Sequence, residues 1–181
     1  MPLYLQARLM FAHRSKKGRV MRFFGNTKFL SERRRLELYP PFFFMRVKVL
    51  EISDDWRKVR VRLPLTSFSI NPGGVVFGGY QAALADPIPA LACGHIFKGW
   101  VVWTRSMHID FVHGGSSDLE LNFEFPRQTE EKIRTQLKAD GRANAEFEYA
   151  YVRDDGVRCT LIRNTVAIRA ASSRTDTRHE A

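Results

Sequence analysis

The residue best suited to chemistry in this 181-residue chain is Asp86, the single charged residue between Phe77 and Cys93. Burying a carboxylate among apolar residues is costly, so its presence in this stretch needs a reason. One reason is catalytic, because a carboxylate in a pocket of low dielectric can serve as a general base. The other is structural, because Asp86 precedes Pro87, and an Asp cap followed by proline restarts a helix. The sequence alone leaves both interpretations open.

Paired glycines precede this carboxylate, in the order Asn71-Pro72-Gly73-Gly74 and then Gly78-Gly79. Glycine lets a ligand approach the backbone closely, and the first turn of a helix presents free N–H groups. Those groups favour an anion or a developing oxyanion. The segment lacks the Gly-Lys-Ser/Thr ending of a phosphate loop and the Gly-x-Gly-x-x-Gly of dinucleotide-binding folds. It therefore indicates an oxyanion site without a nucleotide motif.

The elements that position these residues follow from hydrophobic periodicity. Alternating apolar and charged residues from Met45 to Leu63 predict a hairpin that turns at Asp54-Asp55. The Ala- and Leu-rich run from Phe77 to Cys93 predicts one long helix, buried on all sides and ended by Gly94. Further strands are predicted over 100–112, 119–125, 144–151 and 157–169, with a short helix over 129–138 that Thr129 caps.

A central apolar helix among antiparallel strands is best covered by a curved sheet that wraps around it. The expected fold class is therefore α+β, with an antiparallel sheet around a long central helix. Such a sheet exposes an edge and a face, which favour dimerisation. We expect three parts in the chain: a basic, helical N-terminal arm over 1–38, the domain over 39–171, and a polar tail over 172–181.

Positive charge is concentrated in the arm. Residues 1–35 hold ten Lys or Arg against one acid, Glu32, whereas the rest of the chain holds 19 basic and 18 acidic residues. A nucleic-acid-binding core usually carries this charge on the folded domain, so no nucleic-acid partner is expected. The favoured interpretation is that the arm's aromatic residues pack onto the domain. Contact with an anionic membrane comes second, and a mitochondrial presequence is the remaining alternative.

The two cysteines, Cys93 and Cys159, are too few for a disulfide framework and lack zinc-motif spacing. We therefore expect no metal site, and the scarcity of cysteine favours a reducing cytoplasm. No uncharged apolar run approaches the roughly 18–20 residues of a membrane-spanning helix.

The glycine and aspartate segment resembles that of the hotdog-fold acyl-CoA thioesterases, the group that includes phenylacetyl-CoA thioesterase. Asn71, Gly74, Gly78-Gly79 and Asp86 fall at the places of the family motif. The run from Thr104 to Phe111 is similar to the strand that passes the partner subunit's site in that family. The likeness covers roughly Pro41 to Ala171 and lies nearest to a poorly characterised branch.

This resemblance implies hydrolysis of acyl-CoA, or of another acyl thioester, by attack of water. Asp86 would activate the water or attack the thioester carbonyl, and the backbone N–H of Gly78 would polarise the carbonyl oxygen. Asn71 would position water or substrate, and the hydroxyl of Thr104 would assist from the neighbouring subunit's strand. No cofactor is required, since coenzyme A is part of the substrate. The coenzyme A arm would run along the interface of a homodimer or tetramer, near Gly79 and Arg163.

Two residues depart from the family pattern. Many relatives have a histidine directly before the Gly-Gly pair, where this chain has Phe77. Pro87 lacks an N–H group and breaks a helical hydrogen bond, so Asp86 is expected to point differently than in the enzymes. A non-catalytic acyl-thioester-binding or structural protein is therefore the alternative to a thioesterase.

Overall fold

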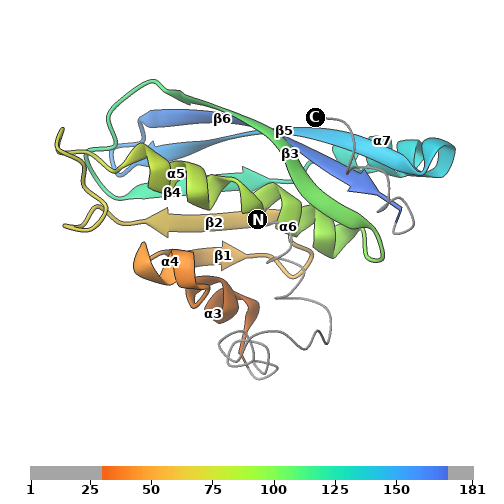
Figure 1. The fold of residues 1–181 in the computed structure, drawn as a ribbon, viewed down its shortest axis with the longest axis horizontal. Coiled ribbons are helices and arrows are strands. Elements are labelled where there is room, and N and C mark those ends of the chain that lie inside the picture. Colours follow the sequence, from red (N-terminus) through yellow and green to blue (C-terminus); the bar gives the residue numbers. More distant parts are fainter. Residues whose placement is uncertain (1–29, 171–181) are drawn as a thin grey trace, which may run out of the picture.

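The computed structural model describes residues 30–170, so most of the predicted arm and all of the predicted tail lie outside the described residues. Its centre is one antiparallel sheet of six strands in the order β1-β2-β4-β5-β6-β3. This agrees with the antiparallel sheet expected from the sequence (Figure 1). The strands are β1 (Lys48–Ile52), β2 (Lys58–Leu63), β3 (Val101–Phe111), β4 (Leu119–Glu124), β5 (Arg142–Arg153) and β6 (Arg158–Arg169).

The strands form where the sequence alternates, because one face of the sheet is buried and the other faces solvent. In β5, Ala145, Phe147 and Tyr149 are buried, whereas Glu146 and Glu148 between them are exposed. Aromatic rings of the buried face then meet across strands, with the Phe123 and Phe147 centroids 5.5 Å apart. The core therefore lies between this face and the helices.

Two consecutive helices, α5 (Gly78–Ala85) and α6 (Pro87–Ile96), run across the buried face of the sheet (Figure 1). The prediction of one uninterrupted helix is not confirmed, because the chain breaks into two helices at Asp86 and Pro87. The prediction that Gly94 ends the helix is wrong. Helix α6 continues to Ile96 and ends where Phe97 leaves helical geometry, with φ −107° and ψ 65°.

Helix α7 (Arg127–Asp140) confirms the predicted helix but is longer than expected. Thr129 does not cap it: Pro126 takes the capping position, and the N–H of Thr129 donates to the Pro126 carbonyl at 3.1 Å. The predicted apolar stripe is present, since Ile133 and Leu137 are buried. The helix ends at Gly141, whose φ of 62° is readily adopted by glycine.

Two short helices, α3 (Glu32–Glu37) and α4 (Pro40–Phe44), lie beside β1 (Figure 1). Helix α3 covers the outer edge of that strand with side chains. The Arg33 guanidinium donates to the Val49 carbonyl at 2.6 Å, and the Val49 N–H donates to the Glu37 carboxylate at 3.0 Å. The β1 edge is thus capped, as exposed edges commonly are in soluble proteins. The domain boundary at residue 38 stays a prediction. Helix α3 lies within the predicted arm, and it packs against β1 of the predicted domain.

No helix among residues 30–170 is long and apolar enough to cross a membrane.

Candidate active site

Asp86 lies at the junction of α5 and α6. Its backbone is helical, with φ −47° and ψ −53°, and its N–H donates to the Ala82 carbonyl at 3.0 Å. Its side chain makes no hydrogen bond that would cap α6. The structural interpretation, in which the Asp86 carboxylate restarts the helix as a cap, is therefore not supported. The carboxylate is left available for another role.

Prolines make this junction unusual, because Pro87 and Pro89 supply no N–H group to the helix. In a regular helix the N–H of residue 89 would bond the carbonyl of residue 85. The hydroxyl of Tyr149, on β5, replaces that donor and bonds the Ala85 carbonyl at 2.9 Å. A strand side chain thus satisfies a buried carbonyl that the helix cannot.

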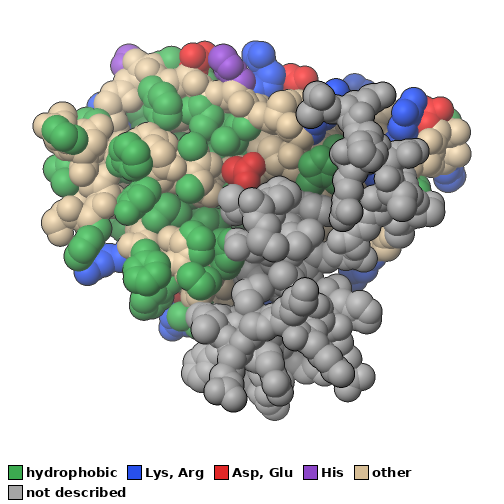
Figure 2. Space-filling model, in the orientation of Figure 1, with side chains coloured by type: hydrophobic (Ala, Val, Ile, Leu, Met, Phe, Trp, Pro, Cys, Tyr) green, Lys and Arg blue, Asp and Glu red, His purple; other side chains and the backbone are tan. Residues whose placement is uncertain are grey.

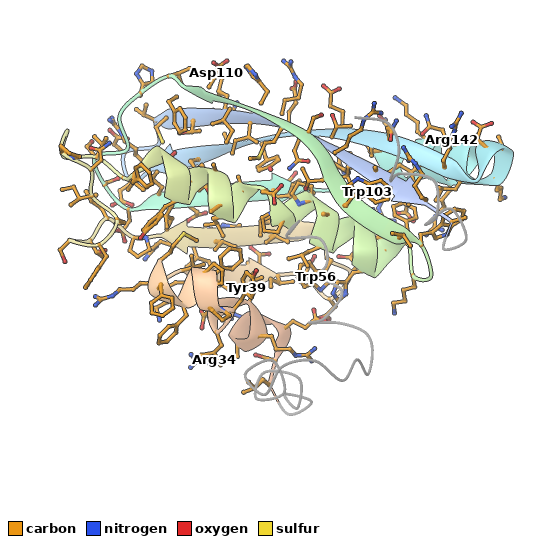
Figure 3. The ribbon with its side chains drawn as sticks, viewed as in Figure 1. Arg34, Tyr39, Trp56, Trp103, Asp110 and Arg142 are labelled. Atoms are coloured by element: carbon orange, nitrogen blue, oxygen red, sulfur yellow. The ribbon has the colours of Figure 1, made fainter. Side chains whose placement is uncertain are left out.

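Two further side chains bond the carbonyl of Asp86 itself. The Thr104 hydroxyl donates from β3 at 2.9 Å, and the Asn164 amide donates from β6 at 3.2 Å. Asn164 also donates to the Tyr149 hydroxyl at 3.2 Å, which joins the three residues into one group. We call Thr104, Tyr149 and Asn164 the junction cluster. Figure 3 shows β3 passing over the helices, with the label Trp103 marking the residue before Thr104.

The hydrogen bonds of the junction cluster hold the junction in place, and Asn164 among them is fully buried. Its Oδ1 atom has no hydrogen-bond partner among the described residues. Of the cluster, the sequence predicted only Thr104, and it predicted a role for that hydroxyl in the neighbouring subunit's site, whereas here it bonds the Asp86 carbonyl of its own chain. Tyr149 and Asn164 were missed, although two prolines in an apolar helix were a signal that other side chains must supply hydrogen bonds.

The electrostatics of the junction suit a base. Partial burial raises the pKa of the Asp86 carboxyl above its ordinary value. Burial also raises the pKa of Tyr149, so its hydroxyl remains a donor at neutral pH. A carboxylate whose proton affinity is increased in this way takes a proton from water more readily than an exposed one.

The N-terminus of α5 forms the second part of the site. Phe77 takes the capping position without a side-chain hydrogen bond, and the N–H groups of Gly78 and Gly79 have no acceptor among the described residues. Aromatic rings enclose them: a Cβ on Gly78 would lie 2.9 Å from the Phe111 ring. A Cβ on Gly79 would lie 2.4 Å from the Phe77 ring. A side chain at either position would therefore have to displace the neighbouring ring, and both rings are about half exposed.

The two parts of the site are separated within one chain. Gly78 and Asp86 are eight residues apart along nearly continuous helix, which corresponds to about 12 Å. One thioester carbonyl cannot contact the Gly78 N–H and the Asp86 carboxylate of the same chain at that separation. A site that uses both groups needs a second copy of the chain.

Asn71 is occupied by its own turn. Its Oδ1 atom accepts from the N–H groups of Gly73 at 2.9 Å and Val75 at 3.3 Å. These bonds shape the loop that leads into α5, as an Asx turn does. The structure thus gives Asn71 a local role, and the predicted contact with water or substrate stays a prediction.

Arg163 lies on the opposite face of the sheet from the helices. It is exposed on β6, with its Nε 3.3 Å from carboxylate oxygens of both Glu146 and Glu148. The next residue, Asn164, faces the helices, because side chains alternate along a strand. Arg163 is therefore not brought to Asp86 within this chain. Its assignment to coenzyme A stays a prediction.

No metal site competes with this assignment in the part of the chain that the structure describes. Residues 30–170 contain no group of three or more His, Cys, Asp or Glu side chains placed to hold a metal ion.

Comparison with known proteins gives the fold a wider context. No family model matches the chain, and no curated protein matches its sequence. Solved structures do match. A Pseudomonas aeruginosa protein of unknown function, described as a probable thioesterase, has a TM-score of 0.68 at 16% identity. The match covers 76% of this chain and 92% of that one.

Two other structures extend the likeness. A thioesterase from Haemophilus influenzae matches with a TM-score of 0.57 at 14% identity, over 75% of this chain and 87% of its own. A protein of unknown function from Chlorobaculum tepidum TLS matches with a TM-score of 0.62 at 14% identity, over 74% and 88%. Identities this low establish the fold alone. The expected resemblance to hotdog-fold thioesterases is confirmed at that level.

Proposed function

We propose that this protein hydrolyses acyl thioesters, with acyl-CoA as the substrate class and Asp86 as the general base. The observation that carries the proposal is the Asp86 carboxylate, which stands at a proline-broken helix junction with a raised pKa and no capping role. The fold, shared with proteins described as thioesterases, supports it. No cofactor is needed, because coenzyme A enters as part of the substrate.

The reaction follows from these groups. The Asp86 carboxylate takes a proton from water as the water oxygen attacks the thioester carbonyl. The carbonyl oxygen becomes an oxyanion, and the Gly78 N–H at the start of α5 donates to it. The oxyanion then collapses, the C–S bond breaks, and Asp86 returns the proton that it took from water to the departing thiolate. The products are a carboxylic acid and the free thiol of coenzyme A.

The distance between the two groups leads us to propose a homodimer. Asp86 of one subunit would face Gly78 of the partner subunit, since about 12 Å separates these groups along one helix. The β3 edge is available for pairing, whereas the β1 edge is covered by α3. A tetramer remains compatible with this arrangement. A cytoplasmic location is part of the proposal, because the free thiols of Cys93 and Cys159 suit a reducing compartment.

A second candidate is a non-catalytic acyl-thioester-binding protein. It is favoured by Phe77, an apolar ring that is half exposed directly before the Gly78-Gly79 pair. This ring supplies no hydrogen bond to a carbonyl group at the start of α5. Binding of an acyl chain without turnover would be the result.

Steady-state hydrolysis on a panel of short, long and aromatic acyl-CoA substrates tests the proposal. Asp86→Ala should lower kcat/KM by about 10²–10⁴-fold, the usual cost of losing an acid–base group. Asp154→Ala, which removes an exposed carboxylate from the last hairpin, is the matched control and should retain activity. Hydrolysis that survives Asp86→Ala would reject Asp86 as the base. No hydrolysis by the wild type, together with binding of the panel, would favour the second candidate.

A further inference from the structure

Three phenylalanines are exposed together at one end of the molecule. Phe43 and Phe44 in α4 are 56% and 73% exposed, and Phe68, between β2 and α5, is 65% exposed. We call these three residues the aromatic end. In Figure 2 hydrophobic side chains gather on the left of the view, over the region of α4 and α5 in Figure 1, with Lys or Arg at the margin. Large exposed apolar patches mark interaction surfaces.

The aromatic end is anchored to the domain and is not a frayed segment. Phe42, in the same short helix, is buried in the core with 1% exposure, so α4 is held while its next two residues face outward. The Phe43 and Phe44 rings meet edge to face at 5.8 Å. The Arg46 guanidinium lies 5.1 Å from the Phe68 ring, which links α4 to the loop after β2.

Three cations at this end form no ion pair among the described residues, although Glu120 lies opposite Arg62 in the β2–β4 pairing. Lys48 and Arg62 lie opposite each other in the β1–β2 hairpin, next in the chain to α4 and to the loop of Phe68. Neither they nor Arg46 form an ion pair with any residue of 30–170. Farther along the hairpin the cations are paired, as Arg60 is with Glu120 at 2.7 Å. Positive charge is therefore left free beside the aromatic end.

We propose that the aromatic end docks onto an anionic lipid bilayer. Phe43, Phe44 and Phe68 would enter the interfacial region, and Arg46, Lys48 and Arg62 would face the lipid phosphates. Aromatic rings beside unpaired cations are the combination that such a surface binds. This inference is independent of the proposed hydrolysis.

A second copy of the chain fits the aromatic end less well. A symmetric contact through it would bring like charges of the two copies together, which is unfavourable. The open β3 edge lies at the opposite side of the sheet from β1 and the helices beside it. Pairing of two copies through β3 would therefore leave Phe43 and Phe44 of α4 away from that edge, and two membrane contacts on one assembly bind more tightly than one.

Sedimentation of the full chain with vesicles tests the proposal. Vesicles of phosphatidylcholine alone are compared with vesicles that also contain phosphatidylglycerol. We expect binding to the anionic vesicles and little to the neutral ones. The double variant Phe44→Ser/Phe68→Ser should lower the partition coefficient at least about tenfold, because it removes two apolar rings from the contact.

The controls separate the aromatic end from the rest of the chain. The ten basic residues of 1–35 are unchanged in the double variant, so a loss of binding belongs to the aromatic end. Leu161→Ser removes an exposed apolar side chain from β6 and should bind like the wild type. Circular dichroism and hydrolysis of a soluble short-chain acyl-CoA verify that the variants stay folded.

Three results would overturn the proposal. In the first, the wild type fails to bind anionic vesicles. In the second, the double variant partitions into these vesicles as strongly as the wild type does. In the third, light scattering gives the double variant a lower assembly mass than the wild type. The last result would mean that a second copy covers the aromatic end. Loss of vesicle binding with hydrolysis intact would support docking whatever the outcome for Asp86.

Discussion

Removing the hydroxyl of Tyr149 should destabilise the protein in a way that depends on Pro89. The Tyr149 hydroxyl bonds the Ala85 carbonyl at 2.9 Å, and the proline at position 89 denies that carbonyl its helical donor. Tyr149→Phe therefore leaves a buried carbonyl without a donor. Its free energy of unfolding should fall by about 1–3 kcal/mol, the cost of an unsatisfied buried group.

Pro89→Ala restores an N–H group to the helix and so supplies the missing donor. In that background Tyr149→Phe should cost only about 0.5–1.5 kcal/mol, the net contribution of an ordinary hydrogen bond. The coupling between the two positions is then about 1 kcal/mol, within the range of contacting residues. Equilibrium urea unfolding of the four proteins at one concentration measures it.

Tyr151 provides the matched control. Its hydroxyl donates to the Gln81 carbonyl at 2.8 Å, and residue 85 is an alanine whose N–H can serve that carbonyl within α5. Tyr151→Phe should therefore cost the same with Pro89 or Ala at position 89. An equal cost of Tyr149→Phe in both backgrounds would refute the explanation of the junction cluster.

Two further predictions concern the site. Because burial raises the pKa of Asp86, the folded state holds that proton more tightly than the unfolded state, so the carboxylate lowers stability as pH rises through the folded pKa. Asp86→Asn should therefore have a higher urea midpoint than the wild type at pH 7, but not in acid. Hydrolysis by the wild type should fall as the pH drops through the same pKa. A urea midpoint of Asp86→Asn below that of the wild type at pH 7 would contradict this explanation. Gly78→Ala places a Cβ 2.9 Å from the Phe111 ring, so kcat/KM should fall about tenfold or more, and Phe111→Leu in the same chain should restore part of it. Full activity of Gly78→Ala would mean that the ring moves without consequence.

The strands were predictable because their signal is local. The alternation of Ala145, Phe147 and Tyr149 with exposed residues reports a half-buried strand wherever it pairs. The same pattern gave no indication that the Tyr149 hydroxyl forms a hydrogen bond, because it predicts Tyr149 only as one more buried residue of the strand. Its hydroxyl acquires a role only when β5 lies under the prolines of the helix.

The candidate site was predictable in its residues but less so in its geometry. The eight-residue separation of Gly78 and Asp86 is visible in the sequence, and so is the proline that breaks the helix. Asn164 could not be predicted as a partner of Asp86, because that contact requires β6 to lie between β5 and β3. The prediction that the helix ends at Gly94 was wrong because glycine permits a helix to end without requiring it. A Cβ at position 94 would meet nothing within 4 Å.

The sheet order also has a consequence for biosynthesis. Strand β3 lies at an edge and pairs with β6, the last strand of the described chain, whereas β1 with β2 and β4 with β5 pair across shorter stretches of sequence. A nascent chain can form those earlier pairs while β3 still lacks its neighbour. Asn164 also reaches Asp86 only from β6. The junction at Asp86 therefore assembles only after β6 has left the ribosome, and until then the apolar face of α5 and α6 lacks part of its cover.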